Sequence, residues 1–157
     1  MKLRSLLFLC LVLATSAIAA DWQPVQSPNA GTQANSLSGV SAVADNDVWA
    51  VGWSFNQRQN VYRTELQHWN GSTWSLVTSP NATNGYNFLN GIAVVAVNDI
   101  WAVGQAANGS TYSTLIEHWN GTSWSIVTSP NVPGFSNVLE AVTVISVNDI
   151  WAVGSSN

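Results

Sequence analysis

Short apolar segments separated by polar turn residues fill most of the chain. In the middle of the sequence, segments rich in Val, Ile, Trp and Thr predict strands at 89–95, 100–104, 114–119 and 124–129. No stretch has helical spacing long enough to compete with this interpretation. Asn98-Asp99 and Asn120-Gly121 lie between consecutive segments, and these residue types favour tight turns. The pattern therefore predicts a four-stranded antiparallel meander.

The same pattern recurs along the chain. Residues 68–81 and 118–131 differ at only three of fourteen positions, and the motif Asn-Asp-(Val/Ile)-Trp-Ala-Val-Gly occurs at 46–52, 98–104 and 148–154. The offsets between these motifs are 52 and 50 residues. A fixed period of this size is typical of repeat architectures. We therefore expect a strand at 22–27 that is equivalent to the fourth strand of a unit. Full units are expected at 37–79 and 89–129, and a partial unit at 139–154.

The predicted strands are apolar on both faces. Residues 91–97 read Gly-Ile-Ala-Val-Val-Ala-Val, whereas a sheet with one solvated face would alternate apolar and polar residues. Sheets that are covered on both sides stack between neighbours, as the blades of a β-propeller do. The sequence thus predicts an all-β protein built from β-propeller-type repeats within residues 21–157.

Two segments carry a resemblance to a known family. "IWAVG" at 100–104 followed by "EHWNGTSWSIV" at 117–127 resembles the kelch-type, galactose oxidase-like β-propeller repeat, and "GSTW" at 71–74 is similar to the tail of the Asp-box of sialidase-like propellers. The chain departs from kelch repeats in having Val103-Gly104 where they carry a glycine pair. The resemblance covers nearly all of residues 22–157 and implies two full blades and two partial ones. An incomplete propeller of this kind is either a piece of a longer array or self-associates to complete a ring.

The first twenty residues have the features of a secretory signal peptide. Lys2 and Arg4 precede an apolar run from Leu6 to Leu13, and small residues end the segment at 17–19. The run is too short to span a bilayer, so we expect no membrane insertion. We expect a secreted protein, extracellular or periplasmic. Cys10 lies in this leader, and no cysteine follows it, so disulfides are not expected to stabilise the fold.

The net charge and the available residue types argue against several classes of function. From residue 21 on, two arginines stand against eight acidic residues, a net charge of −6, which disfavours nucleic acid as a partner. His68 and His118 belong to successive units, so we expect no metal site and no cofactor; each histidine is expected to bond to a neighbouring blade. The recurring Asp47, Asp99 and Asp149 are interpreted as turn caps. No catalytic residues emerge, and we do not expect an enzyme.

Candidate binding residues lie where the sequences of the repeats differ. Eight of the nine tryptophans recur in phase, which indicates packing, and Trp53 is the unmatched one. The two-residue difference between the periods falls in 53–63, which we interpret as a loop that shares one face of the molecule with the connections between units. Either these aromatic loops form a binding face, or their rings fold back onto the blade edge. The candidate residues are Trp53, Phe55, Arg58, Tyr62, Arg63, Tyr86, Phe88, Tyr112 and Phe135.

These features favour a secreted binding module whose ligand is a carbohydrate or an extracellular protein. Two alternatives stay open. The chain is part of a secreted hydrolase, lyase or oxidase whose catalytic residues lie outside it, or it serves as a spacer or assembly module of a surface protein.

Overall fold

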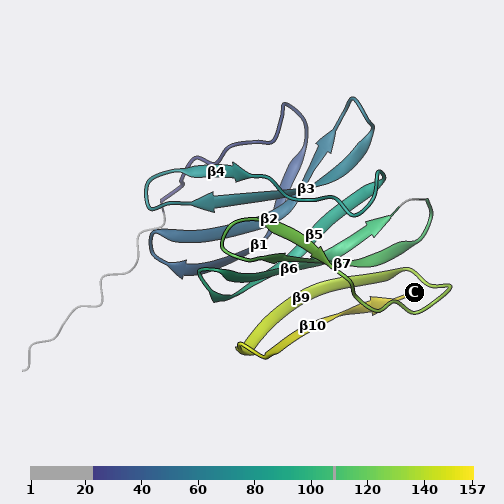
Figure 1. The fold of residues 1–157 in the computed structure, drawn as a ribbon. Helices are drawn as coiled ribbons and strands as arrows, with labels where there is room; N and C mark the ends of the chain where they lie inside the picture. Colours follow the sequence, from purple (N-terminus) through teal and green to yellow (C-terminus); the bar gives the residue numbers. More distant parts are fainter. Residues whose placement is uncertain (1–22, 108) are drawn as a thin grey trace, which may run out of the picture.

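Ten strands make up the computed structural model, which describes residues 23–107 and 109–157 (Figure 1). None of the described residues forms a helix, and so none of them provides a helix that could cross a membrane. The strands are β1 (Asn35–Ala44), β2 (Asp47–Asn56), β3 (Val61–Trp69), β4 (Trp74–Val77), β5 (Tyr86–Ala96), β6 (Asp99–Ala107), β7 (Tyr112–Trp119), β8 (Trp124–Val127), β9 (Asn137–Ser146) and β10 (Asp149–Ser156).

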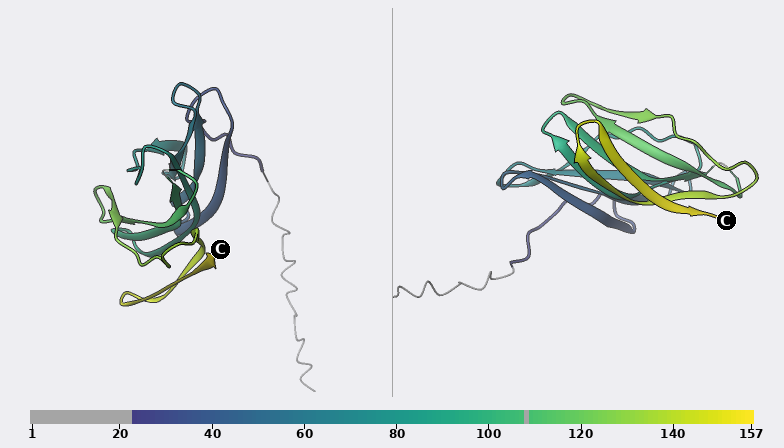
Figure 2. Two further views of the ribbon diagram at one scale, coloured as in Figure 1. Left: turned by 90° about the vertical axis from the view of Figure 1, so that its right-hand side faces the viewer. Right: turned by 90° about the horizontal axis from the view of Figure 1, so that it is seen from below.

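The strands form three antiparallel sheets that follow one another in chain order. The first sheet has the order β1-β2-β3-β4, the second sheet has the order β5-β6-β7-β8, and β9 and β10 form a C-terminal hairpin. Figures 1 and 2 show the second sheet lying between the other two. The predicted all-β fold of four-stranded antiparallel units is confirmed.

The two glycine-containing turns between the third and fourth strands behave as the sequence predicts. Asn70 and Asn120 each accept backbone N–H bonds from the residues two and three positions later, at 2.9–3.0 Å. Gly71 and Gly121 follow them with φ of +91°, a conformation that residues with a side chain rarely adopt. The recurrence of Asn-Gly is therefore explained by turn geometry.

The structure corrects the predicted ends of the strands. The segment 53–63 is not a loop, because β2 runs to Asn56 and β3 begins at Val61. Trp53-Ser54-Phe55-Asn56 alternates aromatic and polar residues, which suits an extended strand, and only residues 57–60 form the connection. Tyr86 and Phe88 likewise lie on β5 rather than in the connection that precedes it. The sheets are thus longer at this end than the repeat signature indicated.

The strand expected at 22–27 is not observed where it can be checked. Residues 23–29 have no strand structure, and Trp22 lies outside the described residues. A short fourth strand such as β4 is stabilised by pairing with the third strand of its sheet. No described strand pairs with residues 23–27. Pro24 also lacks the backbone N–H that a ladder requires. Pro28 instead lies against the first sheet, where its carbonyl oxygen accepts a bond from Gln67 Nε2 at 2.7 Å.

Successive sheets approach most closely along their first strands. A Cβ placed on Gly39 would lie 3.2 Å from the Cα of Gly91, and a Cβ on Gly91 would lie 3.2 Å from the Cα of Ala141. Each of these residues adjoins a register irregularity in its strand pair. Glycine at the first two positions therefore permits backbone-to-backbone contact between β1, β5 and β9.

The main core lies between the first and second sheets. Trp49, Val51 and Leu66 of the first sheet pack with Ile100 and Leu115 of the second, and all five are almost fully buried. Large apolar side chains on β10 are in contrast exposed: Trp151 is 60% and Val153 61% exposed. The expectation of sheets covered on both faces thus applies to the second sheet, which has a neighbour on each side.

Candidate functional site

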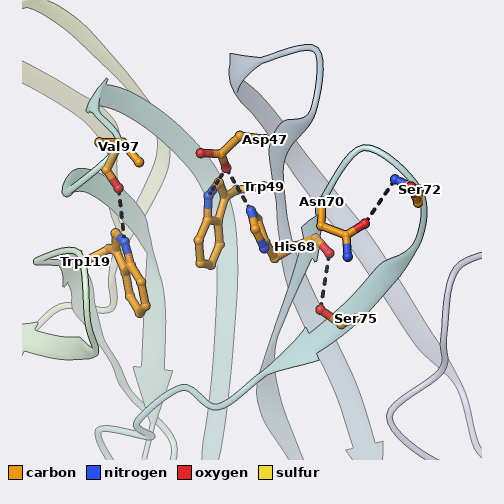
Figure 3. A network of polar contacts seen from close by, with 8 residues as sticks. All are labelled: Asp47, Trp49, His68, Asn70, Ser72, Ser75, Val97 and Trp119. Atoms are coloured by element: carbon orange, nitrogen blue, oxygen red, sulfur yellow. Dashed lines mark hydrogen bonds and ion pairs between the residues drawn. The ribbon is translucent and has the colours of Figure 1, made fainter.

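At one end of each full sheet, the recurring Asp and Trp form a polar contact with a histidine, and Figure 3 shows this contact in the first sheet. Trp49 Nε1 donates to Asp47 Oδ1 at 3.0 Å, and His68 Nε2 lies 2.8 Å from the same oxygen. Because a carboxylate only accepts, the Nε2 atom carries the proton in this contact. The imidazole also stacks on the indole with ring centroids 4.4 Å apart.

The second sheet repeats this arrangement. Trp101 Nε1 donates to Asp99 Oδ1 at 2.7 Å, His118 Nε2 lies 2.8 Å from that oxygen, and the two rings are 4.3 Å apart. Two earlier interpretations are therefore wrong in detail. The aspartates bind side chains rather than capping their turns, and the histidines bond within their own sheet rather than to a neighbouring one. In each sheet, one half-buried aspartate oxygen accepts hydrogen bonds from both the tryptophan and the histidine, so both donors have a partner within the same unit.

Tryptophans that recur in phase pack between the sheets. Trp49 lies 5.1 Å from Trp119 and 5.6 Å from Trp124, measured between ring centroids. Trp119 also donates from Nε1 to the carbonyl oxygen of Val97 at 3.3 Å. The packing interpretation is confirmed for these three residues.

The opposite end carries an aromatic cluster that spans the first two sheets. Tyr62 lies at its centre, with ring centroids 5.0 Å from Trp53, 5.2 Å from Phe55, 5.5 Å from Tyr86 and 5.0 Å from Phe88. Tyr112 joins through Phe88 at 6.4 Å. The structure thus brings together six of the nine candidate residues, from β2, β3, β5 and β7.

Most of these rings pack on one another rather than projecting into solvent. All six are at least partly buried except Tyr86, which is 36% exposed. The rings therefore cover the edge of the two sheets, as the second interpretation of these aromatics expected, while the cluster still forms part of the surface. Phe135 lies apart from it, before β9, and is 52% exposed.

The two candidate arginines have different environments. Arg63 Nη1 donates to the carbonyl oxygens of Thr83 and Gly85, and its Nη2 donates to Asn84 and Gln59. This guanidinium therefore stabilises the connection between β4 and β5. Arg58 lies in the 57–60 turn, is exposed, and makes no hydrogen bond or ion pair with the residues that the structure describes.

A cleft of about 550 Å³ lies next to the aromatic cluster. We call it the loop-end cleft. Phe55 provides an apolar wall, Arg58 and Arg63 provide cationic groups, and Gln33, Asn56 and Gln57 contribute amides. The remaining lining residues are Ala30, Gly31, Thr32 and Ser54. An aromatic wall with amides and a free guanidinium suits a polar ligand that carries an apolar face and acidic groups.

Sequence reasoning missed the segment 30–33 and the three amides. A signal for the segment was present, because Ser27-Pro28-Asn29 repeats Ser79-Pro80-Asn81 and marks the same kind of connection between units. The amides carried no signal of their own, since Asn and Gln are frequent in turns for local reasons.

Two glutamates are buried, one in each full sheet. Glu117 is fully buried; its Oε2 accepts from Ser79 Oγ at 2.6 Å, and its Oε1 has no hydrogen-bond partner in the described part of the chain. Burial raises the pKa of Glu117 to about 8, although the Ser79 bond opposes this shift. Burial also raises the pKa of Glu65, whose Oε1 accepts from Gln67 Nε2 at 2.7 Å. Through Ser79, the Glu117 carboxyl contacts the connection between β4 and β5.

Four-stranded antiparallel sheets stacked face to face, with their first strands in close contact, define a β-propeller-type fold. A solved structure described as "YCF48 bound to D1 peptide", a β-propeller, is similar to this chain with a TM-score of 0.55 and 18% sequence identity, over 86% of this chain. The matched region spans 39% of that structure's chain. At this level of identity the likeness supports the fold alone. No family model and no curated protein matches the chain.

Proposed function

We propose that this chain is a secreted β-propeller-type binding module that takes its ligand at the loop-end cleft. The observation that carries the proposal is that one open cleft combines an aromatic wall, Phe55, with the exposed guanidinium of Arg58, which is unpaired among the residues that the structure describes. Phe55 lies on β2, which pairs with β3 as far as Asn56↔Val61, and Arg58 lies in the short turn that joins these two strands. The aromatic wall is therefore already organised before the ligand arrives, which lowers the entropic cost of binding there.

The ligand class is a carbohydrate or an extracellular protein. The Phe55 ring offers a face for a sugar ring or an apolar side chain, and the amides of Gln33, Asn56 and Gln57 offer donors and acceptors to hydroxyl or peptide groups. Arg58 favours a ligand that carries a carboxylate, since a guanidinium binds carboxylates with two parallel hydrogen bonds. The ligand described for YCF48 is a peptide, which supports including an extended polypeptide among the candidates.

Two further parts of the proposal come from the sequence. The resemblance to kelch-type repeats supports a binding role for the loops, and the signal-peptide features of residues 1–20 support export of the chain. The leader lies outside the described residues. The proposal assigns no catalytic step, metal or cofactor to this chain, and it excludes nucleic acid and membrane insertion as modes of binding.

The experiment uses the exported chain, collected after secretion. A glycan array and a pull-down from extracellular protein identify the retained ligands, and titration then compares the chain with its Phe55→Ala and Arg58→Ala variants. We expect each variant to weaken binding at least about tenfold, which is what loss of one good contact produces. Phe135→Ala is the matched control, because it removes an exposed aromatic ring outside the cleft.

Two outcomes would overturn the proposal. One is a chain that retains no ligand in either screen. The other is a ligand whose affinity is unchanged in both cleft variants. Amino-terminal sequencing of the exported chain tests the leader separately: a start near residue 21 is expected, and a start at Met1 contradicts secretion through this segment.

A further inference from the structure

The dipeptide Asn-Gly recurs along the chain, and it is chemically the most reactive setting for an asparagine side chain. It occurs at 70–71, 84–85, 90–91, 108–109 and 120–121. The side-chain amide of an asparagine reacts with the backbone nitrogen of the next residue, and glycine leaves that nitrogen open because it has no Cβ. Asn108 lies outside the described residues. The other four pairs have different surroundings, and these surroundings decide which of them reacts.

The two pairs in the turns between third and fourth strands have their side chains engaged. Asn70 Oδ1 accepts from the N–H groups of Ser72 and Thr73 at 3.0 and 2.9 Å. Asn120 Oδ1 accepts from residues 122 and 123 in the same way, at 2.9 Å each. Both bonds must break before the side-chain carbon can approach the glycine nitrogen. The turns therefore protect their asparagines, although both asparagines are exposed.

The pair within β5 is protected by the sheets. Asn90 is half-buried, and its Nδ2 donates to the carbonyl oxygen of Leu139 on β9 at 2.8 Å. Gly91 lies in close contact with the backbone of Ala141, since a Cβ added to it would lie 3.2 Å from that Cα. Reaction at this pair would require the strands to separate.

The remaining pair lies in the connection between β4 and β5 and has both reacting groups free. Asn84 is exposed, and its side chain makes no hydrogen bond with any residue that the structure describes. The N–H of Gly85 likewise has no partner within the described ranges. Arg63 binds the backbone carbonyl oxygens of Asn84 and Gly85, which are not the reacting atoms. No hydrogen bond seen in the structure therefore has to break for the side chain of Asn84 to move.

We propose that Asn84-Gly85 is a site of spontaneous covalent modification, in which water converts the amide of Asn84 to an acid. The nitrogen of Gly85 attacks Cγ of Asn84, and a C–N bond forms. The Cγ–Nδ2 bond breaks, and Nδ2 leaves as ammonia with the proton that the Gly85 nitrogen gives up. Water then opens the cyclic imide at one of its two carbonyl groups, which produces either aspartate or isoaspartate at position 84.

The isoaspartate product fits the guanidinium beside it. Opening the imide at the backbone carbonyl turns that carbonyl into a free carboxylate, and Arg63 Nη2 donates to its oxygen at 3.3 Å in the unmodified chain. A hydrogen bond between two charged groups is stronger than one to a neutral carbonyl. Arg63 is therefore placed to accommodate the new negative charge. The inference needs no ligand in the loop-end cleft, so the two proposals fail or succeed separately.

The test follows deamidation in the full exported chain, incubated at mildly alkaline pH either folded or in guanidinium chloride. Chymotrypsin cleaves after aromatic residues, so the asparagines at 70, 84, 90 and 120 fall in separate peptides whose acid forms are measured by mass spectrometry. Dividing the folded rate by the unfolded rate at each site removes the effect of local sequence. We expect this ratio to be at least about tenfold higher at Asn84 than at the other three sites, where local opening must first break hydrogen bonds.

Asn84→Gln is the control for the identity of the site. The side chain of Asn84 is exposed and unbonded among the described residues, so this substitution should leave the fold intact. It should remove the acid form from the peptide 75–86, which also contains Asn81. The proposal is overturned if the ratio at Asn84 is no higher than at Asn70 and Asn120. It is also overturned if the peptide 75–86 of the Asn84→Gln variant converts as fast as the original.

Discussion

Replacing Glu117 with glutamine should change how the stability of the protein depends on pH. The carboxyl of Glu117 is fully buried, and burial raises its pKa from the ordinary 4.5 to about 8. Between these two pH values the unfolded chain releases the proton while the folded chain retains it. The free energy of unfolding therefore falls as pH rises through this window, by about 1.4 kcal/mol for each pH unit at most. Below pH 4.5 the contribution is fully present, and above about 8 it is lost.

The whole pKa difference, from 4.5 to about 8, corresponds to roughly 5 kcal/mol. Glutamine has nearly the same shape, keeps an oxygen for the Ser79 hydroxyl and does not titrate. The first sheet already carries glutamine at the equivalent position, where Gln67 donates to the Pro28 carbonyl oxygen at 2.7 Å. We expect Glu117→Gln to resemble the unaltered protein near pH 4.5 and to be more stable than it by several kcal/mol at pH 8.

Urea denaturation followed by tryptophan fluorescence, repeated from pH 4.5 to pH 8, measures this difference. Comparing the two proteins at each pH cancels the contribution of Glu65, whose pKa is also raised by burial. Glu140→Gln, which changes an exposed carboxylate on β9, is the control and should leave the pH dependence as it is. Parallel pH profiles for the protein and its Glu117→Gln variant would refute the reasoning.

Three further substitutions test other contacts. Asp99→Ala removes the acceptor of two side-chain bonds and should lower the free energy of unfolding by about 2 kcal/mol in urea denaturation; a loss below about 0.5 kcal/mol would contradict the role of that carboxylate. Gly104→Ala would place a methyl group onto the Phe88 carbonyl oxygen and should destabilise the protein by about 3 kcal/mol in thermal unfolding, so an unchanged midpoint would be unexpected. Arg63→Lys keeps the charge but loses the planar donors to the carbonyls at 83–85, and amide exchange at residues 83–87 should accelerate about tenfold; equal protection would show that the guanidinium does not hold this connection.

The repeat architecture was predictable because its signals are periodic. Alternating apolar segments and in-phase Asn-Gly turns gave the number and order of strands in both full units, and the structure confirms them. The pairing of Asp47 with Trp49 was also accessible, since residues two apart on a strand share a face. The histidine partner was not, because the register between β2 and β3 decides it, and register follows from the whole hairpin.

The candidate site was only partly predictable. The aromatics outside the repeat signature were expected at one face of the molecule, and six of them form one cluster. The sequence could not distinguish a ring in solvent from a ring packed on its neighbours, because both use the same residue types. It also could not separate Arg58 from Arg63, since the carbonyl oxygens that hold Arg63 belong to a connection twenty residues away. The buried state of Glu117 likewise depends on the neighbouring sheet, which no local pattern encodes.

The close contact at Gly39 and Gly91 has a consequence for the shape of any assembly built from these units. At these positions the approach of neighbouring first strands is limited by the single hydrogen atom on each glycine, since an added Cβ would lie 3.2 Å from a backbone atom of the next sheet. One methyl group at either glycine would push neighbouring first strands apart by a few tenths of an ångström, and so would change the angle between successive sheets.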